Sequence, residues 1–274
     1  AAQLMVLKSL KKQGVSWNAE VEFVGLADEE RHSVGANDYV RRILEEKQPQ
    51  PETFFIMAEP HFENIVVGAT GKVLLKLEIT GAPGHAATPE KGINAVDCMA
   101  ALLQAVNQTW GSRYREGAAG SHCCLMIHSD YPGYSLNIPQ RCTCLMNKQL
   151  MAEERAEDFL EDLKQIYEKR VGQGTLNITR QIPSYPSYQL PKNQPDLAVL
   201  CALLKQRFQR VPDLKVNQSV SDGNILYQSL GIPTILYGPK GVDFHTEREY
   251  LSLSSLEQYM EELEAYIKTR YAGV

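Results

Sequence analysis

The sequence of 274 residues has no cluster of basic residues and no long apolar run. Its formal net charge is -5, whereas a nucleic-acid binder usually presents a basic face. No apolar segment approaches the roughly 18 uncharged residues that a membrane-spanning helix needs. No glycine-rich phosphate loop follows a predicted strand. These absences argue against nucleic acid, membranes and nucleotides as partners.

No C-x-x-C pair occurs among the cysteines, which are Cys98, Cys123, Cys124, Cys142, Cys144 and Cys201. Most of them lie in apolar or alternating runs, so we predict reduced cysteines that pack in the protein core. Because disulfides are typical of oxidising compartments, we expect a cytoplasmic protein. The hydrophobic content of 43% and the charged content of 22% are typical of a globular fold.

The sequence also lacks an initiating methionine. It begins at Ala1 with an amphipathic pattern over residues 1–14, which predicts a helix with no cap residue before it. We therefore expect that the chain starts inside a fold.

The two ends of the sequence have an α/β pattern. Residues 20–27 and 53–60 read as apolar strands around a helix at 33–47, which is the β-α-β order of a parallel sheet. The pattern resumes after residue 186. Helices are predicted at 195–211, 222–231 and 252–271, and strands at 214–220 and 233–239. We predict one discontinuous α/β domain made of residues 1–70 and 184–274.

The middle of the sequence has a different order of elements. Residues 71–81 alternate cleanly between apolar and polar, as a half-exposed strand does. A helix is then predicted at 92–110, two strands at 121–134 and 141–150, a second helix at 152–170 and a last strand at 174–185. This β-α-β-β-α-β order is typical of a ferredoxin-like unit, so we predict an inserted second domain at residues 71–183.

Charged or polar groups follow the predicted strands of the α/β domain at four places. They are Asp28-Glu29-Glu30, Glu59, Ser221-Asp222 and His245. Ligand sites of open α/β sheets form at the carboxyl ends of the strands, and carboxylates with imidazole suit zinc or a similar divalent ion. Taken one by one, these residues also fit structural roles. The acidic triplet suits a solvated turn, Asp222 a helix cap and His245 a packing position in a loop.

The sequence resembles the co-catalytic zinc hydrolases that include acetylornithine deacetylase, succinyl-diaminopimelate desuccinylase and glutamate carboxypeptidase. The motifs that carry the resemblance are LADEE, MAEP, GAPGHAATPEKGINAV, LNIPQRC, SDGNILYQSLGIPTILYGP and FHTEREYLSL. The resemblance implies a phosphorylase/hydrolase-like zinc-peptidase catalytic domain with an inserted ferredoxin-like lid or dimerisation domain. It also implies hydrolysis of amide or peptide bonds in N-acyl amino acids or short peptides, a homodimer formed through the lid, and two divalent metal ions. We expect zinc, with cobalt or manganese as alternatives.

The resemblance also implies roles for residues of the α/β domain. Glu29 matches the general base and Glu30 a ligand of one metal ion, whose shell His245 completes. Glu59 matches a ligand of the other ion, and Gly238 belongs to a loop that lines the pocket.

In the inserted domain, the resemblance implies that His85 reaches the active site of a partner subunit and helps to polarise the scissile carbonyl. Asn137 matches a residue near the substrate. Relatives commonly carry an Asp-Arg pair where this sequence has Asn147-Lys148, so Arg141 is our candidate for gripping a substrate carboxylate. The plainer alternative for Lys148 is a surface charge at a strand end.

Members of this family begin with about a hundred further residues, as domain size also suggests, and these carry an H-x-D motif and a metal-bridging aspartate. The present sequence has neither. Since a zinc site usually needs three protein ligands and a water, we expect incomplete metal sites and little or no activity in this chain. The alternative is a non-catalytic dimerisation or binding module derived from such an enzyme.

Overall fold

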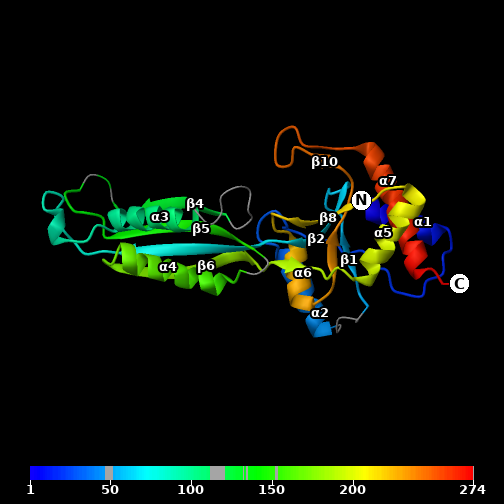
Figure 1. Cartoon of the computed structure of the whole chain (residues 1–274), viewed down its shortest axis with the longest axis horizontal. Coiled ribbons are helices and arrows are strands. Elements are labelled where there is room, and N and C mark those ends of the chain that lie inside the picture. Colours follow the sequence, from blue (N-terminus) through cyan, green and yellow to red (C-terminus); the bar gives the residue numbers. More distant parts are fainter. Residues whose placement is uncertain (47–51, 112–120, 132, 134, 152–153, 274) are drawn as a thin grey trace. The chain divides into compact units, whose positions relative to one another are not determined.

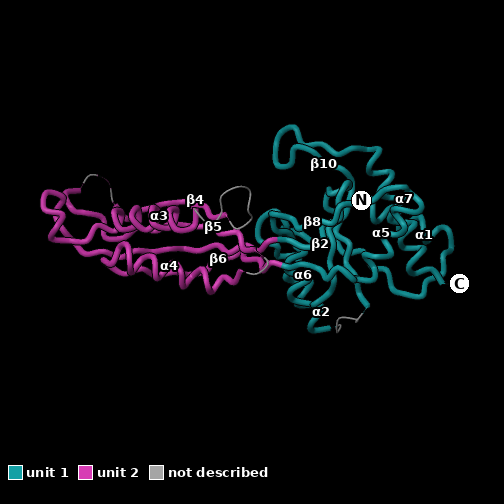
Figure 2. Tube along the Cα trace, in the orientation of Figure 1, with its two compact units in different colours: residues 1–69, 188–274 teal, residues 70–187 magenta. Residues whose placement is uncertain are grey.

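The computed structural model describes residues 1–46, 52–111, 121–131, 133, 135–151 and 154–273. The chain forms two compact units, and Figures 1 and 2 show the course of the chain in each. Unit 1 consists of residues 1–69 and 188–274, and unit 2 of residues 70–187.

Unit 2 is a four-stranded antiparallel sheet with two helices. The strands have the order β4-β5-β3-β6, and they are β3 (Gly71–Thr80), β4 (His122–Ser129), β5 (Arg141–Leu150) and β6 (Thr175–Tyr185). The helices are α3 (Ala95–Gly111) and α4 (Ala156–Arg170), and a short 3-10 helix η1 (Pro89–Lys91) precedes α3. The predicted β-α-β-β-α-β order of elements is confirmed, and the sheet order is that of a ferredoxin-like unit.

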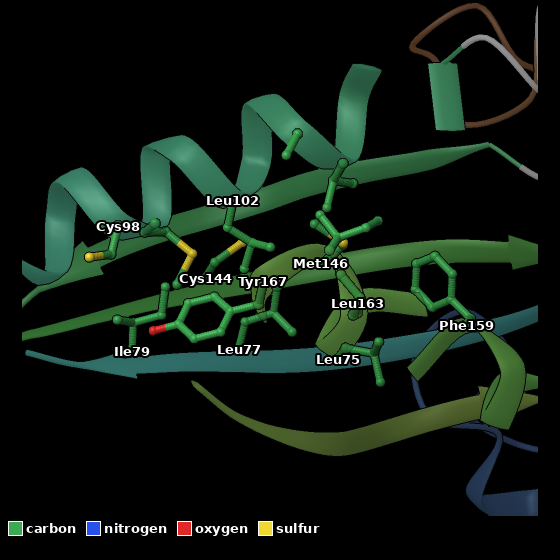
Figure 3. Packing of buried hydrophobic residues seen from close by; sticks show 14 of the residues in the cluster. Leu75, Leu77, Ile79, Cys98, Leu102, Cys144, Met146, Phe159, Leu163 and Tyr167 are labelled. Carbon is green, nitrogen blue, oxygen red and sulfur yellow. The ribbon is translucent and has the colours of Figure 1, made fainter. Parts of the chain in front are cut away.

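The core of unit 2 lies between the sheet and its helices. Along β3, burial alternates residue by residue, so that Val73, Leu75, Leu77 and Ile79 all face the core with no exposed surface. Figure 3 shows these side chains packed with residues of β5, α3 and α4. Each such side chain contributes about 1.5–3 kcal/mol through removal of apolar surface from water.

Unit 1 contains a mixed sheet. Its strands are β1 (Phe55–Met57), β2 (Asn64–Ala69), β7 (Tyr188–Gln189), β8 (Asp213–Asn217) and β9 (Thr234–Leu236). Strand β1 is parallel to β9 and β2 is parallel to β8, but β2 is antiparallel to β9 and β7. The predicted parallel sheet is therefore wrong in part. Only residues 58–63 link β1 to β2, which is too short for a parallel crossover, so the chain reverses.

Unit 1 also contains helices, three of which contribute buried residues to an apolar cluster that they share with the sheet. The helices are α1 (Ala2–Lys12), α2 (Val34–Glu46), α5 (Pro195–Phe208), α6 (Asp222–Leu230) and α7 (Leu253–Tyr271). Leu10 of α1, Leu200 of α5 and Tyr259 of α7 are buried together with Ile65 of β2. A small hairpin, β10 (Gly241–Val242) with β11 (Tyr250–Leu251), precedes α7. Among the described residues, no helix combines the length and apolar character that a bilayer crossing requires.

The strand predicted at residues 20–27 is absent. This segment pairs with none of the described strands, and Phe23 within it is 37% exposed. An alternating apolar pattern favours a strand, but the strand forms only where a neighbouring backbone completes its hydrogen bonds.

The prediction of buried cysteines holds for only part of the set. Cys98, Cys142 and Cys144 are buried in unit 2, whereas Cys123 and Cys124 are exposed and Cys201 is half-buried. The two exposed cysteines lie on β4, which is an edge strand of its sheet, so side chains there are less covered than on the central strand β5.

Candidate functional site

A tight turn before helix α2 holds the acidic triplet. Asp28 has a positive φ of 68°, and its carboxylate accepts hydrogen bonds from the backbone N–H groups of His32 (3.3 Å) and Val34 (3.5 Å) at the start of the helix. Gly35 allows the turn to close, because a Cβ there would lie 2.4 Å from the backbone nitrogen of Ala27. Asp28 is therefore occupied in shaping the turn, which leaves the next two glutamates for other roles.

Glu59 lies just beyond β1, at the sheet edge where β9 also ends. The backbone N–H of Tyr237 donates to the carbonyl of Met57 at 2.8 Å, which joins the two strand ends. A Cβ on Gly238 would lie 2.4 Å from the carbonyl oxygen of Glu59. Gly238 is thus required for close backbone packing against Glu59, a role that the resemblance did not suggest.

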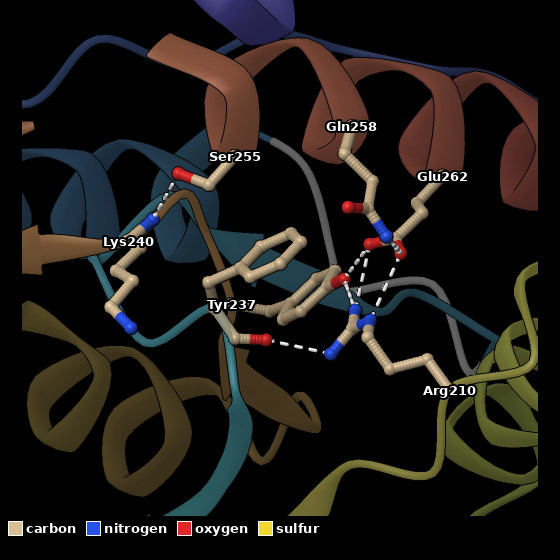
Figure 4. Close-up of polar contacts among 7 residues, drawn as sticks. Arg210, Tyr237, Lys240, Ser255, Gln258 and Glu262 are labelled. Atoms are coloured by element: carbon tan, nitrogen blue, oxygen red, sulfur yellow. Dashed lines mark hydrogen bonds and ion pairs between the residues drawn. The ribbon is translucent and has the colours of Figure 1, made fainter. Parts of the chain in front are cut away.

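A buried polar network supports these strand ends (Figure 4). Glu262 has no exposed surface and accepts from Arg210 Nε (3.0 Å) and Nη2 (2.7 Å), while the hydroxyl of Tyr237 bonds to both side chains. Arg210 Nη1 also donates to the carbonyl of Phe62 at 2.7 Å. Because it holds both Tyr237 and the segment after Glu59, the network fixes where Glu59 stands.

His245 and Glu30 lie close together. The distance from His245 Nδ1 to Glu30 Oε2 is 3.8 Å, and both side chains are largely exposed. His245 itself adopts a positive φ of 60°, and its backbone N–H donates to Glu249 Oε2 at 2.9 Å. The structure therefore brings together two residues that were expected to bind one metal ion.

The pKa values show that the carboxylates act on one another. Burial raises the pKa of Glu29 to about 7, with further increases from the charges of Glu59, Asp222 and Glu30 and an opposing effect of His245. Burial also raises the pKa of Glu59, and Glu30 and Asp222 add to that shift. A carboxyl group with a pKa near 7 is well suited to accept and return a proton at neutral pH.

Asp222 belongs to this cluster, although the family resemblance implied no role for it. Its carboxyl is buried, and burial raises its pKa against a hydrogen bond from Ser33 that lowers it. Its Oδ1 atom accepts no hydrogen bond from the described residues. The alternative that Asp222 caps α6 is wrong, because Ser221 is the cap and accepts from the Gly223 N–H at 3.2 Å. Its place just after the strand predicted at residues 214–220 was the signal in the sequence.

The donor chemistry of this carboxylate cluster (Glu29, Glu30, Glu59, Asp222 and His245) suits a divalent cation. A cation would offset the mutual repulsion that raises the pKa values and would give the buried Asp222 Oδ1 a partner. Yet no three His, Cys, Asp or Glu side chains of the described residues are grouped so as to hold a metal ion. The structure thus offers suitable ligand types in incomplete sets.

The other predicted site residues belong to unit 2. His85 and Asn137 form an isolated antiparallel bridge, so these two lie side by side, and both are exposed. His85 Nδ1 accepts from the Ala87 N–H at 3.0 Å. Arg141 is exposed at the start of β5, where its N–H donates to Asp130 Oδ1 at 3.1 Å.

The alternative of Lys148 as a surface charge is wrong. Its side chain is 1% exposed, and Nζ donates to Glu154 Oε2 at 2.8 Å and to the Gln149 carbonyl at 2.6 Å. Burial lowers the pKa of Lys148, while the bond to Glu154 opposes that effect. Lys148 is thus a buried residue near the carboxyl end of β5, where it forms an ion pair with Glu154.

Comparisons with known proteins agree on one family. The profile of Peptidase family M20/M25/M40 matches residues 1–269. Acetylornithine deacetylase of Yersinia pseudotuberculosis serotype O:1b (strain IP 31758) is 26% identical over 257 residues, which is 84% of this chain and 58% of that protein. The chain therefore spans little more than half the length of this relative.

Solved structures share the fold. The aminopeptidase PepT of Bacillus cereus ATCC 10987 superimposes with a TM-score of 0.77 at 18% identity, covering 97% of this chain and 68% of that one. The YXEP protein of Bacillus subtilis, a dinuclear metal-binding peptidase, gives a TM-score of 0.71 at 12% identity over 97% of this chain and 69% of that one. With the family profile matching nearly every residue, the chain belongs to Peptidase family M20/M25/M40.

Proposed function

We propose that this chain carries part of the active site of a metal-dependent hydrolase of amide or peptide bonds. The observation that carries the proposal is the carboxylate cluster, in which Glu29 has its pKa raised to about 7 beside Glu59, Asp222 and Glu30. Family membership and the deacetylase and aminopeptidase among similar proteins support this reaction class. The substrates we propose are N-acyl amino acids or short peptides.

Glu30 and His245 would hold one metal ion and Glu59 a second ion, with Asp222 as a further carboxylate donor. The dinuclear metal-binding peptidase of similar fold supports two ions, and zinc is our first choice, followed by cobalt or manganese. When bound, such ions polarise a carbonyl group and make water a stronger nucleophile. Glu29 would accept a proton at its carboxylate and donate it to the leaving amine, as its pKa allows.

Residues of unit 2 would bind and orient the substrate. We propose that His85 reaches the active site of a partner subunit and contacts the scissile group there, and that Asn137, which lies beside His85, is near the substrate; both residues are exposed. The exposed Arg141 would donate two parallel hydrogen bonds from its guanidinium group to a substrate carboxylate.

We also propose that unit 2 forms a homodimer through the edge strand β4. Leu125, Met126 and Ile127 are about half exposed on this strand, and a strand at a sheet edge has open backbone groups. The other edge strand, β6, contains Pro183, which lacks an N–H group and makes strand pairing there less favourable. This surface would also serve the alternative function, a non-catalytic dimerisation module.

No three ligand side chains are grouped among the described residues, so we propose that the chain alone holds metal weakly and hydrolyses its substrates slowly. The test is hydrolysis of a panel of N-acyl amino acids and dipeptides at saturating zinc, cobalt or manganese. We expect metal-dependent turnover that falls by about 100-fold or more in Glu29→Gln. The exposed Glu257→Gln variant is the matched control. Turnover that survives chelation or Glu29→Gln contradicts the proposal, and no turnover at all supports the dimerisation module.

A further inference from the structure

Two cysteine side chains of unit 2 lie in contact across neighbouring strands. The Sγ atom of Cys124 on β4 is 3.3 Å from the Sγ atom of Cys144 on β5. Cys124 lies opposite Met146 in the antiparallel register, and the register shifts between Cys124 and Met126. Such an irregularity bends a strand and re-aims its side chains. At this irregularity, the thiol groups of Cys124 and Cys144 lie close enough to react with each other.

The two thiols differ in exposure. Cys144 has no exposed surface and packs in the core between the sheet and its helices, as Figure 3 shows. In the single chain, Cys124 is exposed on the edge strand, so a reagent in solution reaches it when no second copy covers β4. One thiol is therefore accessible to an oxidant, while its partner is accessible only to the first thiol.

The neighbouring cysteines are placed differently. Cys123 is exposed, and its thiol is directed to the carbonyl oxygen of Cys124 at 3.5 Å. The Cys124 thiol contacts the carbonyl oxygen of Met126 at 3.6 Å as well as the sulfur of Cys144. Cys142 is buried, and its opposite residue in the register is Ser129. Among the described cysteines, Cys124 and Cys144 are the pair whose sulfur atoms lie in contact.

We propose that Cys124 and Cys144 form a redox site that is oxidised to an intrachain disulfide by a low-molecular-weight disulfide such as oxidised glutathione. The Cys124 thiolate attacks one sulfur of the reagent, which forms a mixed disulfide and releases one glutathione thiolate. Cys144 then gives up its proton, attacks Cys124 Sγ and releases the second glutathione. Two protein thiols are oxidised and one external disulfide is reduced to two thiols, so electrons and protons balance.

The order of the two attacks follows from the surroundings of each thiol. Burial and the contact with Cys124 raise the pKa of Cys144, which keeps this thiol protonated at neutral pH. The thiolate is the reactive form, so the exposed Cys124 reacts first. The second step is the slower one, and a mixed disulfide on Cys124 should be detectable before it is resolved. The site does not depend on the proposed hydrolase function, because both thiols belong to one chain and neither belongs to the carboxylate cluster.

The test is incubation of the full chain with oxidised glutathione, followed by alkylation and non-reducing peptide mapping by mass spectrometry. We expect a peptide that links Cys124 to Cys144 and release of two glutathione molecules per chain. Cys124→Ser should abolish the link, and it should fold because the side chain is exposed. Cys123→Ser, at the adjacent exposed position, should leave the link intact. Cys144→Ser should stop at the mixed disulfide on Cys124, with one glutathione released.

Three results would overturn the proposal. They are a stable mixed disulfide on Cys124 in the unaltered chain, a disulfide between Cys123 residues of two chains as the main product, or oxidation of Cys144 that still occurs in Cys124→Ser.

Discussion

Gly238 packs so closely against Glu59 that a methyl group on its Cα would lie 2.4 Å from the Glu59 carbonyl oxygen. The contact joins the ends of the parallel strands β9 and β1, and Glu59 is the first carboxylate beyond that edge. The position of one proposed metal ligand is thus set by backbone packing. A residue with no side chain makes that packing possible.

Gly238→Ala should displace Glu59. We expect a loss of about 1–3 kcal/mol in the free energy of unfolding, since the added methyl group meets backbone rather than a flexible side chain. Metal affinity should fall as well. Denaturant unfolding and metal titration measure the two effects. Gly111→Ala is the control, because a Cβ there meets no atom within 4 Å. Equal effects of the two substitutions would refute the packing argument.

Removing one side chain of the buried network around Glu262 should strongly lower the free energy of unfolding. Arg210→Met leaves a carboxylate with no exposed surface beside Tyr237, so we expect the free energy of unfolding to fall by about 3–5 kcal/mol. Replacing Arg210 and Glu262 together by apolar residues should cost clearly less, which a double-mutant cycle measures. Lys240→Met, which removes the exposed ion pair with Glu63, should have little effect. Additive effects of the two core substitutions would contradict this reasoning.

Glu29 should make the metal-free chain less stable as pH rises. Its pKa is about 7 in the folded chain and near 4.5 in the unfolded chain, so the folded state binds more protons between these values. Stability therefore falls as pH increases from about 4.5 to 7. In Glu29→Gln, unfolding followed in the presence of a chelator should show a smaller fall over the same range. A pH dependence identical to that of the unaltered chain would rule out the raised pKa.

The sequence predicted much of the fold because its patterns are local. Strand β3 was predicted at residues 71–81 and is observed at Gly71–Thr80, since alternation marks a half-buried strand whatever lies elsewhere in the chain. Residues 20–27 have a similar pattern without a strand, because pairing depends on a partner that a local pattern does not reveal. Strand β2 was missed, since a short apolar run has no clear period.

The candidate site was predictable only to the level of residue types. Carboxylates after strands indicated the sheet edge, and Glu30 and His245 do lie together. That Asp222 belongs to the cluster could not be predicted from the sequence, because an aspartate is also common at a helix N-terminus. The burial of Lys148 could not be predicted either, since its pairing with Glu154 depends on the packing of unit 2.

Strand β4 should determine the oligomeric state. Met126→Asp places a charge on its exposed apolar surface and should convert the homodimer to monomer, which sedimentation velocity or light scattering detects. Ile182→Asp on the opposite edge strand β6 is the matched control, because Ile182 is 80% exposed in the same sheet. A dimer that dissociates in the control, or survives Met126→Asp, would contradict the proposed interface.

The carboxylate cluster should bind metal, and calorimetric titration of zinc into the chain measures this binding. We expect weak, specific binding that is lost in Glu30→Ala and in His245→Ala, because His245 Nδ1 and Glu30 Oε2 lie 3.8 Å apart. Glu257→Ala, an exposed glutamate outside the cluster, should bind zinc as the unaltered chain does. Binding that is unchanged in Glu30→Ala and His245→Ala, or absent from the unaltered chain at millimolar zinc, would contradict the account.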